Sequence, residues 1–290
     1  MSINIIISSV SLIFAGIFFV INDAIINHLA LLNIKFYHFI FYGTPAYIFV
    51  PIYLIIKGEF KSKMKATNYS IPLLRSLLFA PMPFIVFLCL KNISLPEFTV
   101  INMSSPIFAG ILSLLFLKEK FNFYIIASLI SGFLGVLFVI QPGFQTFNIY
   151  FLLTLFGALL MTITTVIVNK YDHVTSSLGY FVYGGIFSQM LSIPLFIYDP
   201  LVINLNIFAI ITFASVLINL AILLSVFAFK FSQKFYASIF CLVYLQIFWS
   251  TLIGWIIFDE YLNTFAFIGA FLIVLSGIIS IPGQIRQVKE

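Results

Sequence analysis

Long apolar runs dominate this sequence and leave too few charged side chains to coat a water-soluble globule. Of its 290 residues, 62% are hydrophobic and 8% are charged. A soluble domain usually carries about 25% charged residues. Phenylalanine alone contributes 37 residues, and it enters lipid favourably. The composition predicts an integral membrane protein. The basic residues are dispersed between apolar runs and do not indicate nucleic-acid binding.

The apolar runs have the length of membrane helices, which need about 20 residues to cross about 30 Å of hydrocarbon. Polar residues and Pro/Gly positions divide the chain into ten expected spans: 4–24, 34–56, 72–91, 97–117, 122–141, 148–168, 177–198, 206–229, 236–257 and 263–282. These runs are too long and too uniformly apolar for barrel strands, so we expect an all-α membrane fold. The first run has neither a basic start nor a small-residue cleavage site, and we expect it to be retained as a span.

The positions of Lys and Arg predict the orientation of these ten spans. With the N-terminus inside, only Lys35 and Lys91 fall outside. The other twelve fall inside: Lys57, Lys61, Lys63, Lys65, Arg75, Lys118, Lys120, Lys170, Lys230, Lys234, Arg286 and Lys289. We therefore expect a multi-pass protein of the inner (cytoplasmic) membrane with both termini in the cytoplasm.

A weak internal repeat divides the chain into residues 1–143 and 144–290. A shift of 141 aligns four features with later ones: Gly16 with Gly157, Tyr42–Gly43 with Tyr183–Gly184, Glu119 with Glu260, and Asn122 with Asn263. Near the ends the shift slips by one, so that Pro142–Gly143 matches Pro282–Gly283. Five helices are an odd number, so the second repeat should be inverted. Inverted repeats are typical of secondary transporters, although some channels also have them.

Short motifs are spread along the chain: Asn22–Asp23, Leu74–Arg75, Ser105–Pro106, Leu117–Glu119, Phe258–Glu260, Tyr244–Trp249 and Gly254–Trp255. Together they resemble the EamA-type branch of the drug/metabolite transporter superfamily. The resemblance covers nearly the whole chain. It implies two inverted five-helix repeats (the drug/metabolite transporter fold), a central cavity between the halves, and transport of small organic solutes.

Within that superfamily, the Asn22–Asp23 pair followed by a basic segment is similar to S-adenosylmethionine uptake carriers of intracellular bacteria. Those carriers usually have Arg where this chain has Tyr42. If that Arg contacts the solute, this protein carries another one.

Polar residues inside apolar spans are the candidates for solute binding, because burying them in lipid is costly. The candidates are Asn22, Asp23, Tyr42, Asn102, Ser105, Asn219, Tyr244, Gln246 and Trp249. Asp23 is the only acidic residue expected inside a span. Its alternatives are a solute or proton role, a structural hydrogen bond, or exposure near the outer end of its helix. Arg75 is either a gate or anion contact at the cavity mouth, or a side chain that snorkels to lipid headgroups.

Helical spacing adds detail in two spans. In the fourth, Asn102 and Ser105 belong to a narrow stripe of small and polar residues that suits either packing or cavity lining. In the ninth, Tyr244 and Gln246 lie on different faces, and we favour Gln246 with Trp249 as the cavity face. Pro81 and Pro83 should interrupt the third span. Glu119 and Glu260 should tie helix ends to loop amides.

The function expected from this pattern is alternating-access transport of a small metabolite, with S-adenosylmethionine uptake or exchange as the first candidate. Export of amino acids or other metabolites is the alternative, and the coupling mode stays open. No metalloprotease, nucleophile-elbow or paired-carboxylate motif favours an enzyme. No charged ring or carbonyl filter favours a channel. Cys89 and Cys241 have no metal or redox spacing, so we expect no cofactor. Expected partners are the solute and the bilayer, with a homodimer left open.

Overall fold

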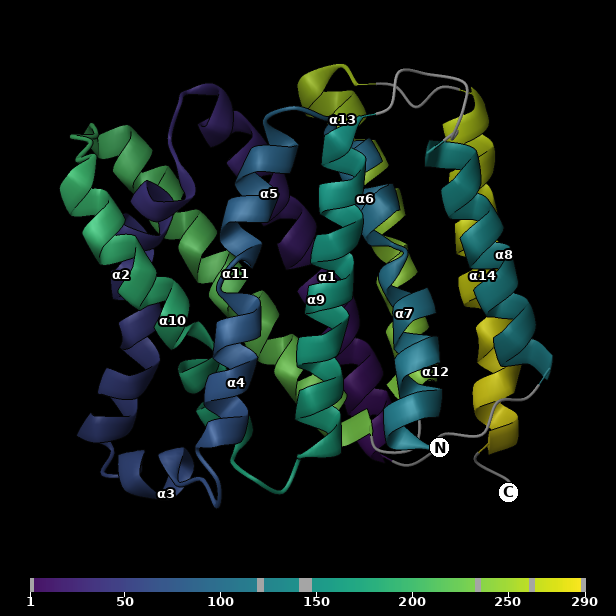
Figure 1. The fold of residues 1–290 in the computed structure, drawn as a ribbon, viewed down its shortest axis with the longest axis horizontal. Coiled ribbons are helices and arrows are strands. Elements are labelled where there is room, and N and C mark those ends of the chain that lie inside the picture. The colour runs from purple at the N-terminus through teal and green to yellow at the C-terminus, as the bar shows by residue number, and fades with distance from the viewer. Residues whose placement is uncertain (1–2, 119–122, 141–147, 233–235, 261–263, 288–290) are drawn as a thin grey trace.

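The computed structural model describes residues 3–118, 123–140, 148–232, 236–260 and 264–287. All regular structure in these ranges is helical, and the long helices run along one axis as a bundle (Figure 1). The first half contains α1 (Ile3–Leu31), α2 (Phe36–Ile56), α3 (Phe60–Met64), α4 (Ser70–Phe79), α5 (Met82–Leu90), α6 (Leu95–Asn102), α7 (Ser105–Leu112), the π-helical turn η1 (Ser113–Leu117) and α8 (Phe123–Ile140). The second half contains α9 (Ile149–Lys170), α10 (Ser177–Tyr198), α11 (Leu205–Ser232), α12 (Tyr236–Phe240), the 3₁₀ turn η3 (Cys241–Tyr244), α13 (Leu245–Phe258) and α14 (Thr264–Gln287).

Seven helical segments of the described chain are long and apolar enough to cross a membrane. They are Ile5–Leu31, Phe36–Ile56, Ser70–Leu90, Leu95–Leu117, Ile149–Lys170, Ser177–Tyr198 and Leu205–Ser232. Shorter apolar helices occupy the other three expected spans: Ile126–Gly135, Leu242–Phe258 and Phe267–Ile279. The predicted helical fold is confirmed, and the total of ten crossings stays a prediction.

Three of the expected spans are broken near their middle. The third breaks between α4 and α5, where Pro81 precedes α5 and Pro83 lies in its first turn. Proline has no N–H to donate and fits best in a first helical turn, which confirms the predicted interruption. The fourth span breaks between α6 and α7, where Met103 and Ser104 separate the two helices. The ninth passes through η3 before α13.

The fourth and ninth spans also end alike. Lys118 has φ 55° and Asp259 has φ 53°, so both residues adopt the left-handed conformation that terminates helices. Just beyond Asp259, the Glu260 carboxylate accepts a hydrogen bond from the Leu95 N–H at 3.0 Å and caps the start of α6. This contact confirms the predicted role of Glu260. Glu119 lies outside the described residues.

Replacing Glu260 by alanine should lower the free energy of unfolding by about 1 kcal/mol, because it leaves the Leu95 N–H without its cap. Burial raises the pKa of Glu260 above its ordinary range. The folded state therefore binds the proton more readily than the unfolded state. The difference in the free energy of unfolding between wild type and Glu260→Ala should be larger at pH values below the pKa of Glu260 in the unfolded chain. It should shrink as the pH rises through the pKa of Glu260 in the folded protein.

Thermal unfolding in detergent across the acid range measures both effects. The neighbouring exposed Asp259, changed to asparagine, is the control and should change little, because asparagine also tolerates the left-handed conformation. Equal losses in the two variants would contradict the capping role.

The α8–α14 pair stands at one edge of the bundle (Figure 1), and small residues hold the two helices together. The Ser128 hydroxyl donates to the Ser276 carbonyl at 2.7 Å, and the Ser131 hydroxyl donates to the Leu272 carbonyl at 3.2 Å. A Cβ added at Gly135 would lie 2.7 Å from the Gly269 carbonyl oxygen. Close approach through small residues and hydroxyls is how helices associate in lipid, where no hydrophobic force drives them together.

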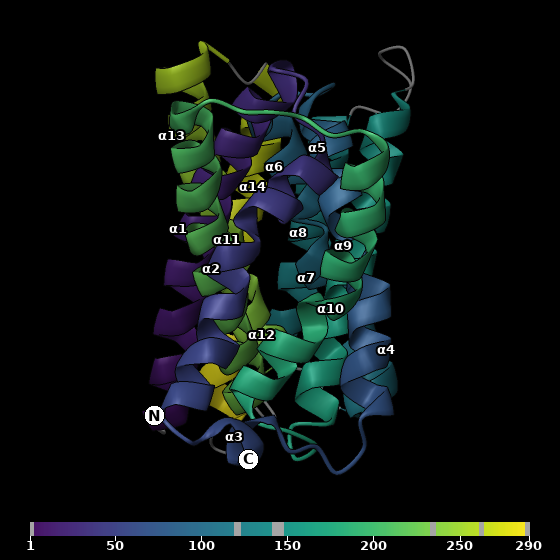
Figure 2. The ribbon, with the colours of Figure 1, turned by 90° about the vertical axis from the view of Figure 1, so that its left-hand side faces the viewer.

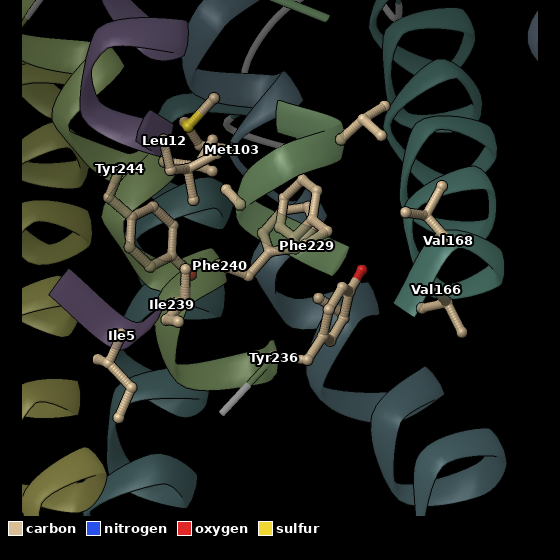
Figure 3. Packing of buried hydrophobic residues seen from close by; sticks show 14 of the residues in the cluster. Ile5, Leu12, Met103, Val166, Val168, Phe229, Tyr236, Ile239, Phe240 and Tyr244 are labelled. Carbon is tan, nitrogen blue, oxygen red and sulfur yellow. The ribbon is translucent and has the colours of Figure 1, made fainter. Parts of the chain in front are cut away.

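A buried apolar cluster joins α11 and α12 to α9 and α1 (Figure 3). The rings of Phe229 and Phe240 stack at 4.9 Å between centroids. The Tyr236 hydroxyl points toward α9 and lies 2.7 Å from Thr165 Oγ1. These contacts fix the short helix α12 against the two long helices of the second half.

The two ends of the bundle differ in charge. The start of α1 and the end of α14 lie at the same end, which also holds α3 and its lysines (Figures 1 and 2). There the Lys63 and Lys65 carbonyls accept hydrogen bonds from Ser176 and Thr175. At the opposite end, Lys35 Nζ donates to Asp199 at 2.7 Å, and this contact holds the pKa of Asp199 below its usual range.

Candidate functional site

A cavity of ≈ 200 Å³ lies inside the bundle, between helices of the two halves. Most of its wall is apolar, with Phe79, Phe181 and Phe229 among the aromatic side chains. The first half contributes the polar residues Asn22, Asp23, Arg75, Asn102 and Ser105. The second half contributes Ser188, Gln189, Ser215, Asn219, Ser225 and Gln246. An apolar cavity with a few convergent polar groups is the usual form of a small-molecule site.

The structure brings most of the predicted site residues to this cavity. Those in its wall are Asn22, Asp23, Arg75, Asn102, Ser105, Asn219 and Gln246. Their contact with a solute stays a prediction.

The remaining three candidates lie outside the cavity wall. The Tyr42 hydroxyl donates to the Leu201 carbonyl at 2.5 Å. The Tyr244 hydroxyl lies toward α8, because a Cβ added at Gly132 would be 2.6 Å from it. Trp249 packs edge-on against Phe248, with 5.1 Å between ring centroids. Tyr42, Tyr244 and Trp249 are therefore not part of this cavity's wall, and their contact with a solute stays a prediction.

Several polar groups in the cavity wall have no hydrogen-bond partner. Asn22 is 1% exposed, and apart from its interaction with the adjacent Asp23 carboxyl, neither its Oδ1 nor its Nδ2 makes a hydrogen bond of full geometry. The hydroxyls of Ser188, Ser215 and Ser225 are likewise buried and unpartnered. Buried polar groups are hydrogen-bonded in more than about 90% of cases, so such a cluster around a cavity indicates a place for a polar molecule.

Four of the polar wall residues were not predicted: Ser188, Gln189, Ser215 and Ser225. One available signal was helical spacing. Ser188 and Gln189 follow Gly184 and Gly185 by four residues, so all four share one face of α10. Ser215 and Ser225 gave no comparable signal.

Arg75 points inward instead of toward the membrane surface. It is 4% exposed, and its Nη1 donates to the Tyr180 carbonyl of α10 at 2.8 Å. Its guanidinium lies 5.9 Å from the centre of the Phe79 ring. The prediction that the Arg75 side chain snorkels to lipid headgroups is therefore wrong in this conformation. Contact of Arg75 with an anion in the cavity stays a prediction.

Three glycines allow the helices around the cavity to approach one another closely. A Cβ at Gly184 would lie 1.9 Å from Arg75 Nη1, and a Cβ at Gly43 would lie 2.1 Å from Ser215 Oγ. Gly16 serves Gln246 similarly, since a Cβ there would meet the Gln246 Cγ at 3.0 Å. The absent side chains leave room for the polar groups that line the cavity.

The broken helices end at this cavity. Asn102 closes α6 and Ser105 opens α7, while Gln246 stands in the first turn of α13 after η3. Discontinuous membrane helices that meet near the middle of the membrane form solute sites in many carriers, because their interrupted backbone can be satisfied only beside protein or a cavity.

Helical architecture, long apolar spans and an internal, mostly apolar cavity with a few polar groups define a multi-pass membrane protein. Residues 2–141 match the EamA-like transporter family, which confirms the predicted resemblance over the first half of the chain. No curated protein matches the chain. The crystal structure of another protein is similar to this chain, with a TM-score of 0.68 and 14% sequence identity. It covers 97% of this chain and 99% of that chain. At this identity the likeness shows the fold alone.

Proposed function

We propose that this protein is a secondary transporter of a small organic metabolite and that the central cavity is its solute site. The observation that carries the proposal is the set of unpartnered polar groups from both halves around one buried cavity of ≈ 200 Å³. The match of residues 2–141 to a transporter family supports it. The solute and the surrounding lipid are the proposed partners, and assembly as a homodimer stays a prediction.

The charges in the cavity wall favour a zwitterionic solute. Asp23 and Arg75 are the charged residues of the described wall, and no ion pair joins them. A solute that carries both charges would compensate both groups, whereas an ion of one sign would leave the other exposed to a low dielectric.

S-adenosylmethionine stays the first candidate solute, and amino acids are the second. The cavity favours the second, because sites for drug-sized ligands measure about 300–1,000 Å³ and this one is smaller in the present conformation. Tyr42, at the position where the similar carriers usually have Arg, lies outside the wall, so this departure does not by itself count against S-adenosylmethionine.

An inverted repeat of two five-helix halves, 1–143 and 144–290, supports alternating access in this proposal. The contact of α2 with α11 has a counterpart in that of α10 with α4. The pairs α2–α10 and α8–α14 each join equivalent helices of the two halves. A twofold relation between the halves accounts for all of these contacts. The family match ends at residue 141, close to the proposed boundary.

Local geometry gives further support for the repeat. The left-handed residues Lys118 and Asp259 are 141 positions apart, as are the glycines Gly43 and Gly184 that approach the opposite half. Two related halves could rock about the cavity and open it to either side in turn. Tighter binding of the solute to one state than to the other would shift that equilibrium. The basic end of the bundle is then the cytoplasmic side of the inner membrane.

Uptake into reconstituted vesicles tests the transporter proposal. Labelled S-adenosylmethionine and a panel of amino acids and nucleotides are offered to vesicles with and without the protein. We expect at least one solute to accumulate or to exchange with unlabelled solute inside. If no member of the panel does either, the proposal loses its basis.

Asp23→Asn should weaken uptake of the transported solute by about tenfold or more. A hydrogen bond to a charged group contributes about 1.5–3 kcal/mol, and each 1.4 kcal/mol is about tenfold in affinity. If Asp23 carries a coupling proton, the pH dependence of uptake should disappear as well.

Asp172→Asn is the matched control for this substitution. Asp172 lies outside the cavity, and its Oδ1 is 3.4 Å from His173 Nδ1. Uptake and its pH dependence should be unchanged in that variant. Unchanged uptake and pH dependence in Asp23→Asn as well would remove Asp23 from the mechanism.

A further inference from the structure

Arg75 is a buried cation whose charge has no counterion in the described chain. The ion pairs there involve only Asp199 and Asp172 as acids, and neither is joined to Arg75. Its Nη1 donates to the Tyr180 carbonyl, a neutral acceptor, and its Nε has no partner. A buried charge without a counterion is strongly unfavourable, so such residues mark functional sites.

Ser225 of α11 is a second donor beside this guanidinium. It is 4% exposed, and its Oγ has no hydrogen-bond partner. Arg75 and Ser225 line both the main cavity and a recess of ≈ 10 Å³ next to it, which Phe79 and Phe229 also border. That volume holds about one water-sized group.

We propose that Arg75 and Ser225 form a subsite for the carboxylate of the solute, with one carboxylate oxygen seated in the recess. This inference rests on the proposed function and specifies which part of the solute this side of the cavity binds. An arginine presents several N–H donors in one plane, which suits a carboxylate, and a serine hydroxyl adds another donor. The recess has room for a single oxygen, which favours a planar carboxylate over a phosphate group.

The neighbouring helix α10 fixes the position of the Arg75 guanidinium. Gly184 faces it so closely that a Cβ would lie 1.9 Å from Nη1. The hydrogen bond to the Tyr180 carbonyl holds the same nitrogen in place. The Nε–H group of Arg75 has no partner in the described protein, so it is the donor that remains available to an anion.

Binding of benzoate, compared with benzamide, tests the subsite without any transport measurement. The two probes have the same ring and size, but only benzoate carries a carboxylate. With the purified protein in phosphatidylcholine nanodiscs, benzoate should raise the unfolding temperature, and the same shift should require a benzamide concentration about tenfold higher. Equal shifts from the two probes would overturn the proposal.

Three variants locate the effect. Arg75→Gln should abolish the preference for benzoate, and Ser225→Ala should reduce it. Gly184→Ala should reduce it by displacing the guanidinium while the arginine is kept, which provides a test even if Arg75→Gln does not fold. Lys91→Gln is the control, because Lys91 is exposed and bonded to Asn33 at the bundle end, and it should keep the full preference. If the preference for benzoate over benzamide persists in both Arg75→Gln and Gly184→Ala, the proposed carboxylate subsite is wrong.

A lipid headgroup is the other anion that Arg75 could bind. Nanodiscs of phosphatidylglycerol separate the two sources. If Arg75 binds the solute, the benzoate shift should be the same in both lipids. If phosphatidylglycerol stabilises wild type but not Arg75→Gln and cancels the benzoate shift, Arg75 binds lipid and the proposal is wrong. If benzoate binding depends on Arg75 but no solute is taken up into vesicles, the carboxylate subsite is supported and the proposed transport function is wrong.

Discussion

Asn22→Leu should leave the unfolding temperature of the protein unchanged or raise it, while solute uptake falls by about tenfold or more. The Asn22 amide interacts with the adjacent Asp23 carboxyl but makes no hydrogen bond of full geometry in the protein, although the side chain is 1% exposed. Replacing an unsatisfied buried amide by an apolar group of similar size can be neutral or stabilising. Loss of a hydrogen bond to the solute costs about 1.5 kcal/mol, which is about tenfold in affinity.

Asn27, one and a half turns further along α1, is the matched control. It is also buried, but its Nδ2 donates to the Leu90 carbonyl of α5 at 3.3 Å. Asn27→Leu should therefore lower the free energy of unfolding by about 1–3 kcal/mol, because the carbonyl loses its partner. Uptake per folded molecule should not change. Thermal unfolding and vesicle uptake measured on both variants distinguish the roles: if Asn22→Leu behaves like Asn27→Leu, Asn22 is structural.

Gly135→Ala should lower the free energy of unfolding by about 1–3 kcal/mol, the usual cost of overpacking a close contact. A Cβ at this position would lie 2.7 Å from the Gly269 carbonyl oxygen and 2.6 Å from Ile273 Cγ1. A backbone oxygen cannot rotate away, so α8 and α14 must separate. The hydrogen bond from Ser131 to the Leu272 carbonyl, already 3.2 Å long, would then stretch.

Gly157→Ala is the control for this effect. Its Cβ would meet Ile85 Cγ2 at 3.1 Å and Met82 at 3.8 Å, and both are side-chain atoms that can shift. Alanine is also about 1 kcal/mol better than glycine in a helix, which offsets the tighter contact. Thermal unfolding of both variants in the same detergent gives the comparison. Equal losses of stability would show that the α8–α14 contact is no tighter than an ordinary one.

Helix positions followed from the sequence, because a chain in lipid must satisfy its backbone hydrogen bonds within each segment. The span expected at 148–168 is α9 (Ile149–Lys170), and that expected at 177–198 is α10 (Ser177–Tyr198). The interruption at Pro81 was also predictable, since it follows from the missing N–H. The end of α1 was placed too early, at 24, because polar residues follow. The helix continues to Leu31, and Asn27 finds its partner in α5.

Which polar residues share the cavity depended on the tertiary structure. Thr162 and Ser225 are both hydroxyl residues inside apolar helices. The Thr162 hydroxyl donates to the Ala158 carbonyl of its own helix at 2.7 Å, while Ser225, in the cavity wall, has a buried hydroxyl without a partner. A hydroxyl can be satisfied by its own helix or left for a solute, and both states look the same in sequence.

The ninth span shows the same limit for helical phase. A regular rotation of about 100° per residue grouped Gln246 with Trp249. Both residues lie in the same helix, α13, three positions apart, yet Gln246 lies in the cavity wall while the Trp249 ring packs edge-on against Phe248 outside it. Apolar patterning by itself determined that this chain forms membrane helices and where they run. Packing of those helices against one another decided which side chains remain unsatisfied, because that depends on partners far away in the sequence.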